Sequence, residues 1–88
     1  MRVDTARDLG LYLRDKRRRA GLSQSEVAAR AGVSRRWLLY FENGRATAEF
    51  GLVLKVTQAL GLIIEVNPAP PREVDLDELL NNLGDPHG

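Results

Sequence analysis

The chain has 88 residues, with 13 Lys and Arg, 12 Asp and Glu, one histidine and no cysteine. This length predicts one small domain, and the lack of cysteine excludes disulfides and thiolate metal sites. No segment reaches the ~18 apolar residues of a membrane span, and the opening segment lacks the apolar core of a signal peptide, so we expect a cytoplasmic protein.

A first helix is expected over residues 6–19. Thr5 is a suitable N-cap, and Asp8 three residues later completes the pattern of a capping box. Four basic residues, 16–19, fall in the last turn, where cations interact favourably with the helix dipole. Gly21 then ends the helix.

Two short helices follow, joined by a very short turn. The sequence from Ser23 to Glu26, Ser-Gln-Ser-Glu, forms a second capping box, and Gly32 ends this helix after about eight residues. Ser34 caps the next helix, which is expected to run to about Asn43. Because only about three residues separate the two helices, they must cross steeply, which predicts a helix-turn-helix.

A fourth helix is expected over Ala48–Leu60, with Thr47 as its N-cap and Gly61 after its end. A helix that is apolar on two sides needs two neighbours. The expected helix has two apolar faces. The larger face comprises Leu52, Val56, Ala59 and Leu60, and the second face comprises Phe50 and Leu54.

The segment Leu62–Val66 is the one predicted strand, and the proline-rich stretch after it cannot continue a ladder. A lone strand leaves backbone groups unpaired. We therefore expect the same strand of a second copy to pair with it, antiparallel across a twofold axis. The alternative is an irregular edge on its own monomer. The predicted homodimer interface comprises Phe50, Leu54, Leu62, Ile63, Ile64 and Val66.

These features divide the chain into a helix-turn-helix domain that also carries the predicted dimerisation segment, 1–66, and a proline-rich linker with an acidic tail, 67–88. The tail is expected to be disordered or to form one short helix capped by Asp75. Residues 1–61 hold 12 basic against 6 acidic residues, whereas 62–88 hold one against 6. A basic body favours a polyanionic partner; the alternative is a charged surface that only confers solubility.

The third helix has the layout of a helix that reads DNA. On a wheel of ~100° per residue, its inward side is defined by Leu38 and Phe41, and its outward side by Arg36, Leu39, Tyr40 and Asn43. The major groove admits one helix, and the N-terminal residues of that helix meet base edges. The alternative is that its arginines are only solvated charge, although cations at a helix start are unfavourable for stability.

Arg35 and Arg36 are the predicted base contacts because a guanidinium group can donate two hydrogen bonds to guanine. Tyr40, one turn after Arg36, is expected to add a hydrogen bond or touch a thymine methyl group. Helix N-termini favour phosphate. The predicted phosphate contacts are Gln24, Ser34, Trp37, Asn43 and Arg45, of which Trp37 has packing against the core as its alternative role.

The stretch Leu9–Val66 resembles the lambda-repressor-like, or Xre-type, helix-turn-helix proteins, and more narrowly the HipB-like antitoxins. The motifs "LSQ.EVA..AGVS" and "FENG" are typical of the broad family, and "RRWL" with "ALGLIIEV" points to the antitoxin-like branch. The resemblance implies an all-α domain of four to five helices in which C-terminal strands pair between subunits. The chain departs from the family pattern after Val66.

The resemblance also implies roles for single residues. It assigns phosphate contacts to Gln24 and Ser34, and it pairs Arg17 of the first helix with Glu42 of the third. It implies double-stranded DNA with a palindromic operator as a partner, and a HipA-like serine/threonine kinase toxin whose operon the pair represses. The alternatives are a stand-alone phage-type or metabolic regulator and, less in keeping with the arginine-rich helix, a coactivator that bridges proteins.

An enzyme is not expected. The single histidine, His87, is next to last, the acidic residues are scattered or in the tail, and no glycine-rich phosphate loop follows a strand. Asp75, Asp77 and Glu78 lack the loop glycine and spacing of a calcium site. We therefore expect no cofactor, no metal and no small-molecule substrate.

Overall fold

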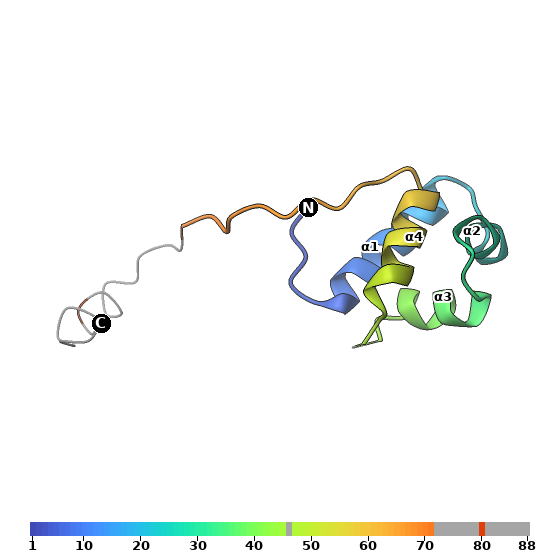
Figure 1. Ribbon diagram of the computed structural model, residues 1–88, viewed down its shortest axis with the longest axis horizontal. Coiled ribbons are helices and arrows are strands. Elements are labelled where there is room, and N and C mark those ends of the chain that lie inside the picture. The colour runs from blue at the N-terminus through green and yellow to red at the C-terminus, as the bar shows by residue number, and fades with distance from the viewer. Residues whose placement is uncertain (46, 72–79, 81–88) are drawn as a thin grey trace.

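Four helices follow one another in the computed structural model, which describes residues 1–45, 47–71 and 80 (Figure 1). They are α1 (Ala6–Arg19), α2 (Gln24–Ala31), α3 (Arg35–Glu42) and α4 (Phe50–Ala59). The prediction of an all-α domain with a helix-turn-helix is thus confirmed for the described residues. None of these helices has the length and apolarity that crossing a membrane requires.

The first two helices begin with the capping boxes that the sequence predicts. The Thr5 hydroxyl accepts a hydrogen bond from the Asp8 backbone at 3.1 Å, and the Asp8 carboxylate accepts one from the Thr5 backbone at 3.1 Å. Ser23 and Glu26 make the same reciprocal pair at the start of α2. These bonds satisfy donors that a helix start leaves unpaired, so each start is fixed locally.

The turn between α2 and α3 is set by one glycine and one serine. Gly32 caps the end of α2 with a left-handed φ of 70°, a conformation that is costly for residues with a Cβ. The Ser34 hydroxyl then accepts a hydrogen bond from the Trp37 backbone at 3.0 Å and so starts α3. Val33 between them packs partly against the core, which anchors the turn.

The start of α4 differs from the prediction. Thr47 is not its N-cap, and Ala48 is not helical: the helix begins at Phe50, after Glu49, which makes no side-chain capping bond. Ala48 instead lies half-buried against the core in the connection from α3. This tertiary contact outweighs the local capping signal of Thr47, so the helix begins two residues later than predicted.

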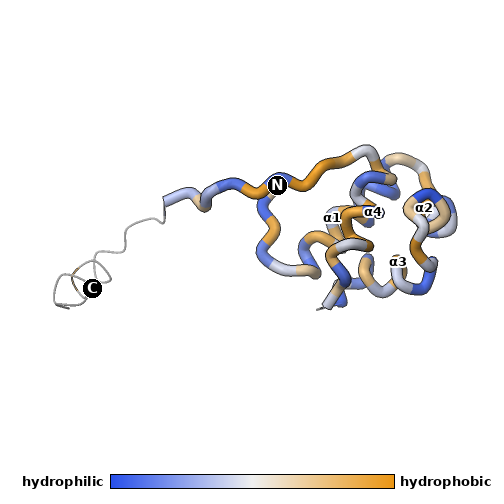
Figure 2. The backbone as a smooth tube through the Cα atoms, in the orientation of Figure 1, coloured by the Kyte–Doolittle hydropathy of each residue, from blue (hydrophilic) through white to orange (hydrophobic). Residues whose placement is uncertain are grey.

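The core contains apolar side chains from all four helices and is completed by half-buried residues around it. α4 packs mainly against α2, and α3 contacts both α1 and α2. Figure 2 shows apolar segments of the helices turned toward one another. The core residues are Leu13, Val27, Ala28, Ala31, Leu38, Phe41, Val53 and Val56.

The larger apolar face predicted for α4 is correct only in part. Val56 is fully buried, and Ala59 and Leu60 pack partly against the core, but the helix is rotated so that Val53 and Thr57 are buried as well. The Thr57 hydroxyl donates to the Val53 carbonyl at 2.7 Å, which satisfies it inside the helix. A threonine can face the core when a carbonyl of its own helix accepts the hydrogen bond from its hydroxyl. A prediction from hydropathy alone misses such a buried residue.

Residues 62–71 continue after α4 without helix or strand, and this segment extends away from the helices (Figure 1). Leu62 and Ile64 pack partly against the core, whereas Ile63 and Val66 are 80% and 93% exposed. No strand pairing exists within the described residues of one chain, so the predicted intersubunit strand stays a prediction. The predicted tail helix that Asp75 would cap lies outside the described residues.

The backbones of α1 and α3 lie close together at Gly10, which is buried. A Cβ placed there would lie 2.1 Å from the carbonyl oxygen of Phe41 and 3.1 Å from its carbonyl carbon. Both atoms belong to the backbone, so they cannot move aside as a flexible side chain would. Glycine at this position therefore sets how near α3 lies to α1.

We expect Gly10→Ala to lower the free energy of unfolding by about 3 kcal/mol, the upper range for overpacking, and Tm by about 15 °C for a domain of this size. Thermal unfolding followed by circular dichroism at fixed protein concentration measures the change. Gly51→Ala in α4 is the matched control, because its Cβ would meet nothing within 4 Å. Equal stability of the Gly10 variant and this control would contradict the packing argument.

Candidate nucleic-acid interface

α3 turns its apolar side inward and its basic start outward. Leu38 and Phe41 are 0% and 2% exposed, which agrees with the helical wheel. Arg35 and Arg36 in the first turn are exposed, and Tyr40 one turn later is 37% exposed. The packing of one side fixes the rotation of the helix, so the two arginines project from the domain surface.

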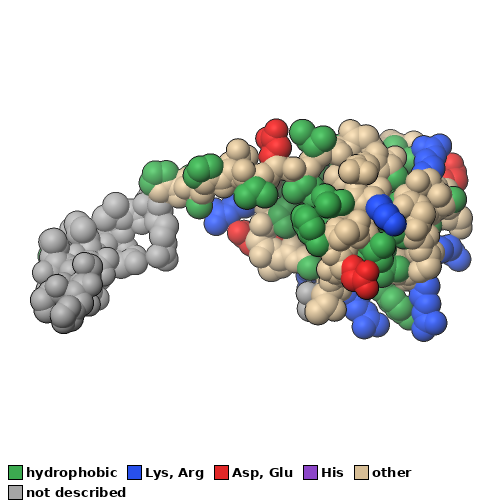
Figure 3. All heavy atoms as spheres, in the orientation of Figure 1, with side chains coloured by type: hydrophobic (Ala, Val, Ile, Leu, Met, Phe, Trp, Pro, Cys, Tyr) green, Lys and Arg blue, Asp and Glu red, His purple; other side chains and the backbone are tan. Residues whose placement is uncertain are grey.

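Basic side chains gather around this helix. Figure 3 shows Lys and Arg groups over the end of the molecule where α2 and α3 lie, with few acidic groups among them. A surface of this sign attracts a polyanion and raises the rate at which it associates. The position of the basic surface therefore agrees with the outward face of α3.

Arg36, Tyr40 and Arg45 form a cluster on the outward face. The Nε group of Arg36 donates a hydrogen bond to the Tyr40 hydroxyl at 3.1 Å. The guanidinium carbons of Arg36 and Arg45 lie 5.6 Å and 4.4 Å from the centroid of the Tyr40 ring, within the range of cation–π contacts. The sequence predicts each residue as a DNA contact but not their contacts with one another.

Trp37 lies half-buried on the flank of α3 and stacks on Phe41, with ring centroids 5.1 Å apart and an interplanar angle of 18°. This stack supports the packing role that the sequence leaves open for Trp37. A phosphate contact through its indole N–H stays a prediction. The stack also forms part of the floor of an open hollow lined by Trp37, Tyr40, Phe41, Arg45, Thr47, Ala48 and Glu49.

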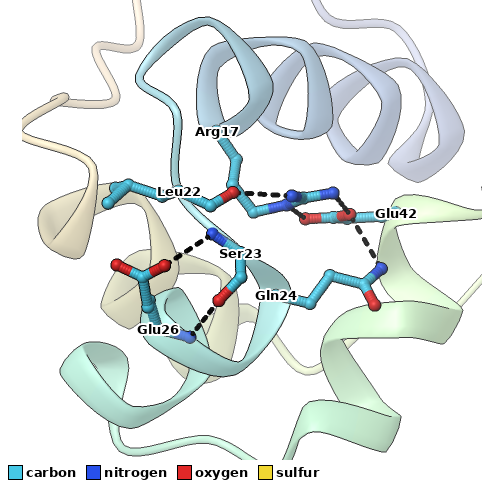
Figure 4. A network of polar contacts seen from close by, with 6 residues as sticks. All are labelled: Arg17, Leu22, Ser23, Gln24, Glu26 and Glu42. Atoms are coloured by element: carbon cyan, nitrogen blue, oxygen red, sulfur yellow. Dashed lines mark hydrogen bonds and ion pairs between the residues drawn. The ribbon is translucent and has the colours of Figure 1, made fainter.

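On the inward side of α3 lies a buried ion pair between Arg17 of α1 and Glu42 at the end of α3 (Figure 4). The Arg17 Nε and Nη2 groups donate to the two carboxylate oxygens of Glu42 at 2.7 Å and 2.8 Å. The side chains are 9% and 1% exposed. The structure thus brings together the two residues that the family resemblance pairs.

The ion pair also holds the start of α2. Arg17 Nη1 donates to the Leu22 carbonyl at 2.8 Å, and the Gln24 side-chain amide donates to Glu42 Oε1 at 3.2 Å. Hydrogen bonding to Glu42 raises the pKa of Arg17, while burial acts in the opposite direction. The guanidinium group therefore stays charged, and one network joins the ends of α1 and α3 to the beginning of α2.

An open polar hollow of about 430 Å³ surrounds the start of α2 and is lined by Arg17, Arg18, Ser23, Gln24, Ser25 and Arg35. It joins the end of α1, the free backbone N–H groups of α2 and the start of α3 in one place, a combination suited to a phosphate group. Arg18 and Ser25 are not among the phosphate contacts that the sequence predicts. The sequence does contain a pattern that favours Arg18, because α1 ends in arginines and only a short turn separates them from the N-cap of α2.

The remaining predicted phosphate contacts lie at the ends of α3. Ser34, before its first turn, is exposed, and its hydroxyl oxygen already accepts from the Trp37 backbone, which leaves its hydrogen to donate. Asn43 caps the other end and is exposed, as is Arg45 beyond it. The other predicted contact, Gln24, begins α2; it is half-buried, and its side-chain amide donates one hydrogen bond to Glu42.

Beside this surface, the Glu26 carboxylate accepts from the backbone N–H of Ser23, and this hydrogen bond lowers the pKa of Glu26. Because the folded pKa is depressed, the bond stabilises α2 above the ordinary pKa of a glutamate and is lost as pH falls through the lower folded value. The cap of α2 therefore persists at neutral pH.

Comparison with known proteins identifies the family. A family model described as a helix-turn-helix domain matches residues 8–65. An uncharacterized HTH-type transcriptional regulator of Sinorhizobium fredii, y4mF, is 40% identical over 65 residues, which cover 74% of this chain and 86% of that protein. Another uncharacterized HTH-type transcriptional regulator, from Methanothermobacter thermautotrophicus, is 37% identical over 49 residues, covering 56% of this chain and 71% of that protein.

The chain therefore belongs to the helix-turn-helix family of transcriptional regulators, as the resemblance in its sequence predicts. Two solved structures share its fold. One, described as MDT Protein, has a TM-score of 0.74 and 23% identity over 80% of this chain and 99% of that one. The other belongs to a HipB-O1-O2 complex, with a TM-score of 0.72 and 22% identity over 77% and 99%. The predicted likeness to HipB is thus confirmed for the fold.

We expect Arg17→Met to lower the free energy of unfolding by about 3–5 kcal/mol, because it leaves the buried Glu42 carboxylate without its counter-charge. Urea unfolding followed by circular dichroism measures the loss. The double variant Arg17→Met/Glu42→Leu, which removes both charges and keeps apolar volume, should recover most of the stability. A single variant as stable as the wild type would show that the ion pair contributes little.

Proposed function

We propose that this regulator is a homodimeric repressor that reads a palindromic operator with α3. The observation that carries the proposal is the exposure of Arg35 and Arg36 at the first turn of a helix anchored from behind by Leu38 and Phe41. The first-turn residues of such a helix are those that reach base edges in the major groove. Arginine is well suited to this position because it can bond guanine O6 and N7 together.

Further contacts would position the helix on the duplex. The polar hollow at the start of α2, with Arg18, Gln24 and Ser25, suits one backbone phosphate, and Ser34 and Arg45 suit its neighbours. Phosphate contacts carry no sequence information but fix the register of the protein on DNA. The proposal places the protein in the cytoplasm and involves no enzymatic activity, cofactor or small-molecule substrate.

The homodimer in this proposal is supported by apolar groups that one chain leaves exposed. Phe50 at the start of α4 is 61% exposed, and Ile63 and Val66 are more exposed still. Leu54 is half-buried, and Leu62 and Ile64 already pack partly against their own core. A second copy adding its segment 62–66 would cover the exposed groups and pair the backbone. Two α3 helices would then meet half-sites ~34 Å apart.

We further propose that the protein is the antitoxin of a HipBA-like pair that represses its own operon together with a HipA-like kinase toxin. The shared fold with HipB and the sequence motifs of the antitoxin-like branch support this assignment. The alternative is a stand-alone Xre-type regulator. A kinase-like reading frame beside the gene would favour the first function, and a solitary gene the second.

We expect the wild-type protein to shift a duplex taken from upstream of its own gene, with an affinity that falls at least tenfold between about 50 and 200 mM salt because counterions are released. Arg35→Ala/Arg36→Ala should weaken specific binding at least 30-fold, because each bidentate guanine contact contributes about 1–3 kcal/mol. Electrophoretic mobility shift at several salt concentrations measures both.

The charge-matched control for this experiment is Arg2→Ala/Arg19→Ala. These two exposed arginines pair with Asp4 and Asp15 at 3.0 Å and 2.8 Å, and they lie outside the proposed reading surface. This variant should bind within about threefold of the wild type. Equal losses in both double variants would show that net charge, and not the reading helix, accounts for binding.

We expect Ile63→Asp to convert the dimer to a monomer that keeps its helical content, because Ile63 is 80% exposed in one chain and its loss leaves the core intact. Sedimentation equilibrium measures the mass, and circular dichroism the fold. Leu39→Asp on α3, which changes another exposed leucine-sized side chain, should remain dimeric. A wild-type protein that is monomeric at all concentrations would contradict the dimer proposal.

A further inference from the structure

Tyr40 is in contact with two of the arginines that the proposed function uses. Its hydroxyl accepts a hydrogen bond from Arg36 Nε at 3.1 Å, and its ring lies 4.4 Å from the guanidinium carbon of Arg45. Arg36 precedes it by one helical turn, and Arg45 follows α3. One side chain therefore joins a residue assigned to base contact and a residue assigned to phosphate contact.

Neither contact uses the N–H groups with which Arg36 and Arg45 would bind DNA. The hydrogen bond to Tyr40 uses only the Nε–H of Arg36, so both Nη groups remain for an end-on, bidentate contact with guanine O6 and N7. The cation–π contact uses the face of the Arg45 guanidinium group, whereas its N–H bonds lie in the plane and point outward. Tyr40 thus restrains each arginine without occupying the atoms that would bind DNA.

We propose that Tyr40 is a positioning residue that orders Arg36 and Arg45 before DNA arrives, an inference that rests on the proposed DNA-reading function. Long arginine side chains lose considerable rotamer freedom when they bind. Restraining them in the free protein removes part of this cost at the moment of association, which increases affinity. Tyr40 acts through the arginines in this role, in addition to the direct base contact that the sequence predicts.

Two substitutions separate the hydroxyl from the ring. Tyr40→Phe keeps the aromatic face for Arg45 and removes the acceptor for Arg36, whereas Tyr40→Leu removes both. The matched control is Tyr12→Phe, because Tyr12 also has a cation over its ring, Lys16 at 5.3 Å, but lies on α1. Tyr40 is 37% exposed, so neither change is expected to unfold the domain.

The first measurement uses the free protein and needs no DNA. In NMR spectra of the arginine Nε–H groups, Tyr40→Phe should speed solvent exchange of the Arg36 Nε–H about two- to tenfold, the range for loss of one hydrogen bond. The ring-current shift of the Arg45 side chain should persist in Tyr40→Phe and disappear in Tyr40→Leu. Unchanged Arg36 exchange and an unchanged Arg45 shift in both variants would overturn the inference.

The second measurement is fluorescence anisotropy with the duplex from upstream of the gene. Tyr40→Phe should weaken binding about two- to tenfold at an unchanged salt slope, since no phosphate contact is lost. Tyr40→Leu should weaken it further and reduce the salt slope by about one, because Arg45 no longer holds its phosphate. Tyr12→Phe should bind as the wild type does.

The two measurements distinguish failure of this inference from failure of the proposed function. Wild-type binding that neither Tyr40 variant weakens would overturn the positioning role while leaving the DNA-reading function in place. Ordered arginines in the NMR spectra, in a wild-type protein with no salt-sensitive binding to the duplex, would overturn the proposed function itself.

Discussion

The buried ion pair between Arg17 and Glu42 is the interaction on which the arrangement of this protein depends. Its carboxylate belongs to Glu42, the residue after Phe41, and both side chains are buried, so the two together define the inward side of α3. Successive helical residues differ by ~100°, so fixing this side also fixes the direction of Arg36 and Tyr40. The ion pair, together with Leu38 and Phe41, thus sets the rotation of α3.

A buried ion pair contributes less to net stability than its geometry suggests, because both charges lose their hydration. Its distinguishing property here is the number of elements it joins. Arg17 also binds the Leu22 carbonyl, and Gln24 binds Glu42, so the turn before α2 and the first residue of α2 share the network. Helices of eight residues are not stable alone. Their positions must therefore come from tertiary contacts such as this network and the close approach at Gly10.

The parts of the fold that could be predicted from the sequence are those that local chemistry determines. The capping boxes at Thr5 and Ser23 and the glycine at position 32 involve residues within one turn, so their positions in the chain predict where helices begin and end. The start of α4 could not be predicted in this way, because it depends on Ala48 packing against residues far away in sequence. The burial of Thr57 was missed for a related reason, since hydropathy does not show that its own helix satisfies the hydroxyl.

The same distinction applies to the candidate site. A helical wheel predicts that Arg36 and Tyr40 face outward, because Leu38 and Phe41 define the opposite side. It cannot predict that Arg45, beyond the end of the helix, turns back onto the Tyr40 ring, or that Arg18 joins Arg35 around the start of α2. These contacts depend on the path of a turn and on the crossing of two helices. The sequence thus predicts which residues lie at the candidate site. The contacts by which one side chain restrains another can be identified only once the fold is known.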